Sequence, residues 1–320
     1  MTELAGKAPT VATRPTLAPW LLVAAGLLAL AALPLVLPTY QVSVATQILI
    51  FAVLAMSIDV LAGYAGRTSL CHGAIFGAST YVVLYASTVA GLPLILSMAL
   101  GVIAATLLAA LFGVLAVRTS GVYFLLLTLA LGLIVWGVCL RWTAVTGGEN
   151  GLRGQLQVGA LAKAQNLYFV VLAGFAALSF GMWRFVHSPF GLTLRGIKDS
   201  ESRMRSLGYN VSVHLVIAFT VSGFFAGMAG ALYAIFNNFV SPSTVQLSQS
   251  VAGLLMAIVG GIGTLFGSLV GAFLIIALEQ AVSLYTERWL MVLGAMFVLI
   301  MIFAPEGVVG KARALLARKR

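Results

Sequence analysis

HSPFGLTLRGIKDSESRMRSLGYNVS, residues 187–212, is a polar segment between two apolar runs, residues 167–186 and 213–236. It holds six charged side chains in a chain of which only 8% of the residues are charged. Each flanking run, at about 1.5 Å per residue, is long enough to cross the roughly 30 Å of a bilayer's hydrocarbon as a helix. The arrangement predicts two membrane helices joined by a charged, partly helical loop, which is a suitable contact surface for another protein.

The composition excludes a soluble protein. Charged residues are far below the share of about 25% found in soluble domains, and the mean hydropathy is +1.09. The apolar runs are continuous, without the period-two alternation of a β-barrel. We therefore predict an all-α, polytopic transmembrane helical bundle with about 9–10 membrane segments. These segments are expected at residues 19–38, 42–62, 75–91, 93–117, 121–141, 167–186, 213–236, 248–262, 266–283 and 288–304.

The basic residues predict the orientation. With the N-terminus inside, cytoplasmic segments hold 14 of the 18 Lys and Arg residues, the bias that the positive-inside rule describes. This topology accounts for the net charge of +10, so we expect a lipid bilayer around the chain and no nucleic acid. The predicted parts are a cytoplasmic N-terminal tail 1–18, a transmembrane domain 19–304 with an outer loop 142–166 and a cytoplasmic loop 187–212, and a basic cytoplasmic tail 305–320.

Two glycine-rich broken elements share the pattern G-x-(I/L)-F-G-(A/S), at residues 73–78 and 263–268. Each follows a glycine-rich interruption, 63–66 in the first case and 260–261 in the second. Non-helical backbone at membrane depth persists only where protein or a water cavity satisfies it, and paired interruptions point to a substrate path. We interpret the two elements as counterparts of an internal duplication. For any single glycine, as in residues 223–227, close helix packing is the alternative.

Polar residues at the breaks are candidates for the substrate path. An intramembrane acid is also a functional candidate by default, but we expect Asp59, one turn before the first break, to pair with Arg67. A satisfied, hydrogen-bonded histidine is the alternative for His72. The candidates at the breaks are Thr68, Ser69, His72, Gly260, Gly261 and Gly263.

The sequence lacks enzymatic machinery. No G-x-x-x-x-G-K-(S/T) motif occurs, so this chain is not expected to bind ATP through a P-loop. His, Cys and acidic residues do not cluster at metal-ligand spacing, and Cys71 and Cys139 stand in apolar surroundings. We therefore expect no catalytic residue, no bound metal and no bound cofactor.

Several segments of the chain match one family in the right order. They are GYAGRTSLCH (63–72) with Phe76-Gly77, RTSGVYF (118–124) with TLA (128–130), TGGENGL (146–152), SPFG (188–191) with Leu194-Arg195 and Leu207-Gly208, GMAGALY (227–233), GGIG (260–263) with Phe266-Gly267, and FAPEG (303–307). Together they resemble the permease subunits of bacterial branched-chain amino acid ABC importers of the LIV type. Segments 118–124 and 188–195 resemble the M-type subunit rather than its H-type paralogue. Asp59 stands where the family often has Asn, and residues 196–200 replace a more usual alanine- and acid-containing run.

The resemblance implies an assembly in the bacterial cytoplasmic (inner) membrane, with both termini of this chain cytoplasmic. Its implied partners are a paralogous H-type permease, two cytoplasmic ATPase subunits that use ATP, and a periplasmic or lipid-anchored solute-binding protein. Docking of the binding protein would use the outer loop, at Thr146, Gly147, Gly148 and Asn150. Residues 188–208 would form the coupling helix, with Pro189, Gly191, Arg195, Asp199, Glu201, Arg203, Arg205, Leu207 and Gly208 as its residues. Ser200 or Asp199 would cap a short helix there.

The resemblance further implies transport of branched-chain or hydrophobic amino acids, and adds Tyr123 and Thr128 to the substrate path. Hydroxyl groups and backbone donors at helix breaks suit the charged groups of an amino acid, and apolar walls suit its side chain. Urea, short amides and aromatic acids are alternative substrates within the family, and distantly similar sugar permeases are a further alternative. An ATP-independent small-solute channel is the alternative from another class, although it would not need the 187–212 loop.

Overall fold

The computed structural model describes residues 18–283, 291–292, 294–295, 298, 302 and 307–311, with side chains from residue 26 onward except at position 160. The predicted tail 1–18, helix 288–304 and tail 305–320 fall wholly or largely outside these residues. The helices are α1 (Ala18–Val36), α2 (Thr39–Asp59), η1 (Val60–Tyr64), α3 (His72–Thr88), α4 (Leu94–Ala116), α5 (Val122–Arg141), α6 (Thr143–Thr146), η2 (Gly148–Asn150), η3 (Gly159–Ala162), α7 (Ala164–Val186), α8 (Pro189–Asp199), α9 (Glu201–Ser206), α10 (Val211–Asn237), η4 (Pro242–Val245), α11 (Leu247–Gly260) and α12 (Gly267–Ser283). The strands are β1 (Leu152–Arg153) and β2 (Phe239–Val240).

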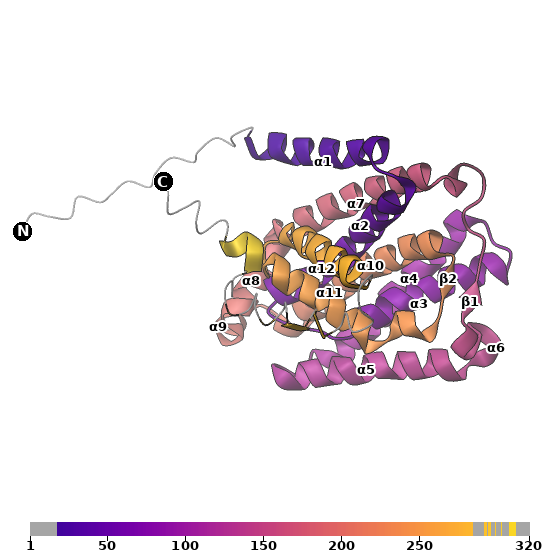
Figure 1. Cartoon of the computed structure of the whole chain (residues 1–320). Helices are drawn as coiled ribbons and strands as arrows, with labels where there is room; N and C mark the ends of the chain where they lie inside the picture. Colours follow the sequence, from indigo (N-terminus) through magenta and orange to yellow (C-terminus); the bar gives the residue numbers. More distant parts are fainter. Residues whose placement is uncertain are drawn as a thin grey trace, which may run out of the picture.

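The predicted all-α membrane bundle is confirmed. In the described part of the chain, five helices are long and apolar enough to cross a membrane: α2 with η1, α4, α5, α7 and α10. The shorter apolar helices α11 and α12 form the two pieces expected from residues 248–283, and residues 261–266 separate them. The helices run roughly side by side and form an elongated bundle (Figure 1).

α2 and α10 form the centre of the bundle, whereas α4 and α5 lie at its surface. In the apolar window of α2, 83% of the residues are buried, against 28% in α4 and in α5. α10 can pack closely on α4 because Gly223 and Gly227 have no side chain. A β-carbon at these positions would clash with Ala109 and Ala105, respectively. At these two glycines the packing alternative is therefore what the structure shows.

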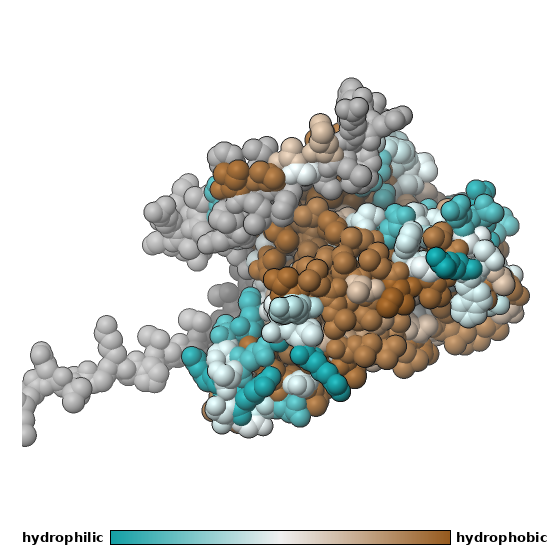
Figure 2. All heavy atoms as spheres, turned by 90° about the horizontal axis from the view of Figure 1, so that it is seen from below, coloured by the Kyte–Doolittle hydropathy of each residue, from teal (hydrophilic) through white to brown (hydrophobic). Residues whose placement is uncertain are grey.

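The polar surface gathers at the two ends of the bundle, with a brown apolar band between them (Figure 2). α8 and α9 lie at one end, and α6 and β1 lie at the other (Figure 1). The loops 187–212 and 142–166, predicted on opposite sides of a membrane, thus occupy opposite ends of the molecule. The band between the ends is the surface that a bilayer would cover.

Candidate functional site: the junction of two broken elements and the polar loop

The first broken element lies where α2 ends. α2 passes into the π-helical turn η1, and residues 65–71 then run irregularly until α3 begins at His72. A β-carbon on Gly63 would lie 2.6 Å from the backbone nitrogen of Gly263 and 2.8 Å from its Cα. Glycine at position 63 therefore permits a backbone approach that no other residue would leave room for. The two breaks, 200 positions apart in the sequence, touch at this point.

At the second break, the irregular residues 261–266 between α11 and α12 give two backbone donors to the end of α2, just before the first break. The N–H groups of Gly263 and Leu265 donate to the two carboxylate oxygens of Asp59, at 2.6 and 2.9 Å. Asp59 is fully buried. A carboxylate accepts on both oxygens, whereas an asparagine amide has a single acceptor oxygen, which explains physically why Asp suits this position. Asp59 thus satisfies two backbone N–H groups of the irregular segment that separates α11 from α12.

The expected pairing of Asp59 with Arg67 is wrong, because both of these residues have other partners. Arg67 forms an ion pair with Glu201 of α9 and donates to the backbone oxygen of Thr119 at 2.9 Å. Its guanidinium also lies over the ring of Phe124, 5.6 Å from the ring centroid. The side chain is 7% exposed. Arg67 therefore joins the first break to the α4–α5 turn and to the polar loop.

α8 of the polar loop also contacts the first break. Lys198 Nζ donates to the backbone oxygen of Gly63 at 2.7 Å. The aliphatic stem of Lys198 lies against Gly66, whose φ of +70° favours glycine and whose absent side chain leaves room for that stem. The guanidinium of Arg195 stands 4.9 Å from the ring centroid of Tyr64, at cation–π distance. Lys198, Arg195 and Glu201 therefore all reach residues 63–67.

A buried polar cluster surrounds His72 at the start of α3. Its Nε2 lies 2.7 Å from Ser222 Oγ, and Ser222 Oγ donates to the backbone oxygen of Ser57 at 2.6 Å. Because Ser222 gives its proton to Ser57, Nε2 of His72 is the donor of the first bond, and Nδ1 accepts from Ser69 Oγ at 3.2 Å. His72 is fully buried. This satisfied arrangement matches the alternative interpretation of His72, and it connects α3 to α10 and α2.

The predicted path residues fall into three places. Ser69, His72 and Thr128 belong to one cluster, since the N–H of Leu70 donates to Thr128 Oγ1 at 3.1 Å. Gly260, Gly261 and Gly263 shape the second break, and Thr68 is half-buried in the first. Tyr123 lies apart, 76% exposed near the start of α5.

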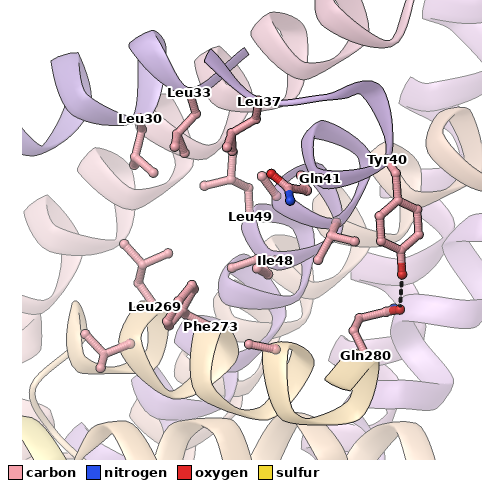
Figure 3. Close-up of a pocket in the computed structure, with 14 residues that line it drawn as sticks. Leu30, Leu33, Leu37, Tyr40, Gln41, Ile48, Leu49, Leu269, Phe273 and Gln280 are labelled. Atoms are coloured by element: carbon pink, nitrogen blue, oxygen red, sulfur yellow. Dashed lines mark hydrogen bonds between the residues drawn. The ribbon is translucent and has the colours of Figure 1, made fainter. Parts of the chain in front are cut away.

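A groove of about 660 Å³ lies elsewhere, between α1, α2 and α12. Its walls are mostly aliphatic, with the hydrogen bond from Tyr40 to Gln280, 2.9 Å long, at one end (Figure 3). None of the predicted path residues lines it. The groove therefore adds no chemistry to the junction of the breaks.

The polar loop has one face on the bundle and another in the open. Ser188 caps α8 and Ser200 caps α9, each accepting a backbone N–H at 3.3 Å, so the predicted capping at Ser200 is confirmed. Pro189 occupies the first turn of α8, where its missing N–H costs nothing. Buried on the bundle side are Leu194, Ile197 and Met204. Exposed on the other side are Asp199, Arg203, Arg205, Leu207 and Gly208.

The bend into the loop and its exit both use glycine. A β-carbon on Gly191 would meet the backbone at the end of α7, around Val186. Gly208 has a φ of +86° just after α9. Both predicted glycines therefore have a conformational role in shaping the loop.

At the opposite end, the outer loop is shaped by its backbone. Gly147, Gly148 and Gly151 have φ values of 73°, 59° and 67°. Thr146 is buried, and its hydroxyl oxygen lies within hydrogen-bond distance of the backbone oxygens of Cys139 and Trp142, at 2.6 and 2.8 Å. Of the four predicted docking residues, Asn150 is exposed, Gly147 is partly exposed, and Thr146 and Gly148 lie within the loop.

In the described ranges, no group of three His, Cys, Asp or Glu side chains is placed to hold a metal ion. In the junction, charged side chains of the polar loop contact the first break, and the buried carboxylate of Asp59 accepts two hydrogen bonds from the second. Sequence reasoning missed Lys198 as a member of this junction, although its charge beside apolar spans was a signal. Ser222 and Ser57 gave no signal, since serine is common in such helices.

Comparisons with known proteins agree with a polytopic membrane protein. Residues 40–301 match the family described as "Branched-chain amino acid transport system / permease component". The high-affinity branched-chain amino acid transport system permease protein LivM of Salmonella typhimurium is 26% identical over 313 residues, which cover 89% of this chain and 74% of LivM.

Two further relatives match over shorter stretches. The autoinducer 2 import system permease protein LsrC of Klebsiella pneumoniae is 29% identical over 157 residues, 47% of this chain and 44% of LsrC. The high-affinity branched-chain amino acid transport system permease protein LivH of Escherichia coli is 26% identical over 128 residues, 39% of this chain and 41% of LivH. No solved structure matches this chain significantly.

Proposed function

We propose a function from one premise: the chain belongs to the family of branched-chain amino acid transport system permease components, which it matches over residues 40–301. It is a multi-pass membrane protein and, in our proposal, the M-type permease subunit of an ATP-driven importer. The long match to LivM and the shorter match to LivH support the M-type assignment. The chain would lie in the bacterial cytoplasmic membrane with both termini inside, and ATP hydrolysis would be left to partner subunits.

One observation carries the proposal: the polar loop exposes large apolar side chains beyond the apolar band of the bundle. Leu192 and Leu207 are 61% and 66% exposed, and Tyr209 is 43% exposed. They stand among charged residues at an end of the molecule where lipid tails would not cover them. Large apolar side chains exposed among polar residues are typical of protein contacts. We assign this face to a cytoplasmic ATPase subunit.

The predicted topology supports positions for the other proposed partners. A solute-binding protein would dock at the opposite end, where Glu149, Asn150 and Arg153 are exposed. An H-type paralogue would complete the permease within the membrane. The positive-inside count supports this orientation, because the 187–212 loop then faces the cytoplasm, where ATPase subunits are found.

Branched-chain or other hydrophobic amino acids are the proposed substrates. The printed names of LivM and LivH support this class, while LsrC is named for autoinducer 2 import. Amides, urea and aromatic acids therefore remain the competing solutes to be compared. The hydroxyl and backbone groups near Ser69, Thr128 and Gly261 are the proposed polar contacts of the path.

The test is a pull-down of the tagged chain from its native membranes, followed by mass spectrometry and uptake assays in vesicles. We expect ATPase subunits and a second permease to be recovered, and uptake to require ATP and the binding protein. Leucine, urea and phenylalanine, supplied in parallel, distinguish the substrate classes. Recovery of this chain alone, together with solute flux in the absence of ATP, would contradict the proposal and favour the channel.

A further inference from the structure

The two breaks are in direct contact and share hydrogen bonds. Irregular backbone at membrane depth must find partners within the protein. The N–H groups of Gly263 and Leu265 find theirs on the buried carboxylate of Asp59. Since Asp59 belongs to the last turn of α2 before the first break, the second break is held by the helix that leads into the first. A change in the backbone at residues 263–265 would therefore alter both hydrogen bonds to Asp59.

Gly63 contacts both the second break and the polar loop. It lies one helical turn beyond Asp59, with no room for a β-carbon beside the backbone of Gly263. Its carbonyl oxygen accepts the hydrogen bond from Lys198 Nζ, at 2.7 Å. A bond to an ammonium group is stronger than one between neutral groups. One residue therefore connects α8, the first break and the second break.

The other charged contacts of the loop land on the same short stretch. Arg195 stacks on Tyr64, and Glu201 pairs with Arg67. Tyr64 and Arg67 are both buried, with exposed fractions of 4% and 6%. Three contacts from α8 and α9 thus hold residues 63–67, while the exposed face of the loop, with Leu192 and Leu207, points to another partner. The loop has one surface for that partner and one for the breaks.

We infer that Lys198, Gly63 and Asp59 form a mechanical linkage that makes the position of the α8–α9 loop and the conformation of both breaks interdependent. Lys198 is a positioning residue: it acts on the breaks through the Gly63 carbonyl and touches neither ATP nor solute. Asp59 transmits the displacement of the first break to Gly263 and Leu265. This inference rests on the proposed function, because it takes the ATPase as the source of the loop's movement.

The decisive variant is Lys198→Met, which keeps the aliphatic stem against Gly66 and removes the bond to Gly63. Lys198→Arg keeps a charged donor and serves as the conservative variant. Arg184→Met is the matched control, since Arg184 is an exposed cation at the end of α7 and lies outside the linkage. All three are prepared as the complete assembly with its ATPase subunits and reconstituted in vesicles with the binding protein and leucine.

The primary measurement is the amount of leucine taken up per ATP hydrolysed. Losing a hydrogen bond to a charged group changes an equilibrium by about tenfold or more, so we expect Lys198→Met to lower this ratio by about tenfold. We expect hydrolysis itself to persist, Lys198→Arg to recover much of the ratio, and Arg184→Met to keep it. An unchanged ratio in Lys198→Met, with full assembly, would overturn the linkage.

A second readout reports on the break itself, whether or not uptake is intact. Thr264 is partly exposed within the second break, so Thr264→Cys supplies a site for a thiol reagent. The labelling rate should change when ATP and vanadate are added to the otherwise native chain, and should not change in the Lys198→Met background. If the labelling rate changes equally with and without Lys198→Met, the linkage is contradicted but the proposed function is not. Failure of the otherwise native chain to assemble with ATPase subunits would instead contradict the proposed function.

Discussion

The two polar ends of the bundle are held by different means. At the α8–α9 end, charged side chains from Arg195, Lys198 and Glu201 reach residues 63–67. At the other end, the outer loop is shaped by left-handed glycines and by the antiparallel pairing of β1 with β2, Leu152 opposite Val240. The inner loop reaches residues 63–67 through charged side chains, whereas the outer loop combines strand pairing and positive-φ glycines with neutral side-chain bonds such as that between Leu156 N–H and Asn238 Oδ1.

The difference teaches what each end is suited to do. Side-chain contacts connect a loop to distant backbone and carry its displacement to that backbone. Glycines at positive φ let the outer loop adopt turns that other residues rarely take, and the β1–β2 pairing and the Leu156–Asn238 bond fix those turns in place. The inner end is therefore suited to transmit movement, and the outer end to present a fixed shape.

The largest expected effect comes from breaking the charged attachment at the inner end. Glu201→Arg places a second cation beside Arg67, whose side chain is 7% exposed. Leaving a buried charge without its partner costs about 3 kcal/mol of folding free energy, which thermal unfolding of the purified protein in detergent would measure. Glu149→Arg, an exposed acid of the outer loop, is the control and should shift stability by less than about 0.5 kcal/mol. Equal shifts in the two variants would contradict the comparison.

A smaller effect is expected from breaking the backbone at the outer end. Gly151→Ala puts a β-carbon about 3.0 Å from the carbonyl carbon of Val240, at a φ of +67°. We expect a loss of about 2 kcal/mol from the left-handed conformation and the clash together. Gly159→Ala has a similar φ of +62° with nothing within 4 Å, and it should cost only about 1 kcal/mol. Thermal unfolding measures the difference in stability between the two variants. Equal losses in Gly159→Ala and Gly151→Ala would show that the contact with Val240 of β2 does not add to the cost.

A third variant removes one side-chain bond from the outer end. Asn238 has a φ of +53°, and its Oδ1 accepts the N–H of Leu156 at 2.8 Å. Asn238→Gly keeps the backbone conformation but loses this acceptor, so we expect about 1 kcal/mol of destabilisation. Asn237→Ala, which removes an exposed bond to Phe239, should cost less than about 0.5 kcal/mol. If both variants unfold at the same temperature as the unsubstituted protein, the side chain of Asn238 does not stabilise the outer loop.

The smallest effect on stability should come from the exposed face of the inner loop. Leu207 is 66% exposed, so Leu207→Asp should change stability by less than about 0.5 kcal/mol while preventing recovery of the ATPase subunits. Val158→Asp makes the same change at a residue that is 69% exposed at the other end, and it should leave recovery unchanged. If Leu207→Asp recovers as much ATPase as the unsubstituted protein, Leu207 does not contribute to ATPase binding.

Much of the fold was predictable from local sequence. Within the described residues, the apolar runs predicted the positions of the long helices within a few residues, and the glycines at 260–263 predicted the division between α11 and α12. Asp199 or Ser200 was predicted as a cap, because capping depends on the residues that follow directly, and the structure has Ser200 in this role. The start of α3 at His72, rather than at residue 75, was not predicted, since the polar His72 is stabilised there by Ser222 and Ser69.

The candidate site was predicted only in part. The breaks and the polar loop were each located, but the partners of Asp59 and Arg67 were not. Arg67 is closer to Asp59 in sequence than to Glu201, which made the wrong pairing plausible. Lys198 was one cation among several in the loop, and its hydropathy does not reveal that its ammonium group reaches a glycine carbonyl.

The sequence by itself determined the class of the protein, its membrane segments, its two broken elements and its charged loop. These features depend on the local density of apolar, charged and glycine residues, and a bilayer selects segments by that density. Only the tertiary structure decided that Asp59 holds Gly263, 204 positions away, and that Lys198 holds Gly63, 135 positions away. Such bonds depend on how the helices pack, because a buried donor takes whichever acceptor the fold brings within about 3 Å.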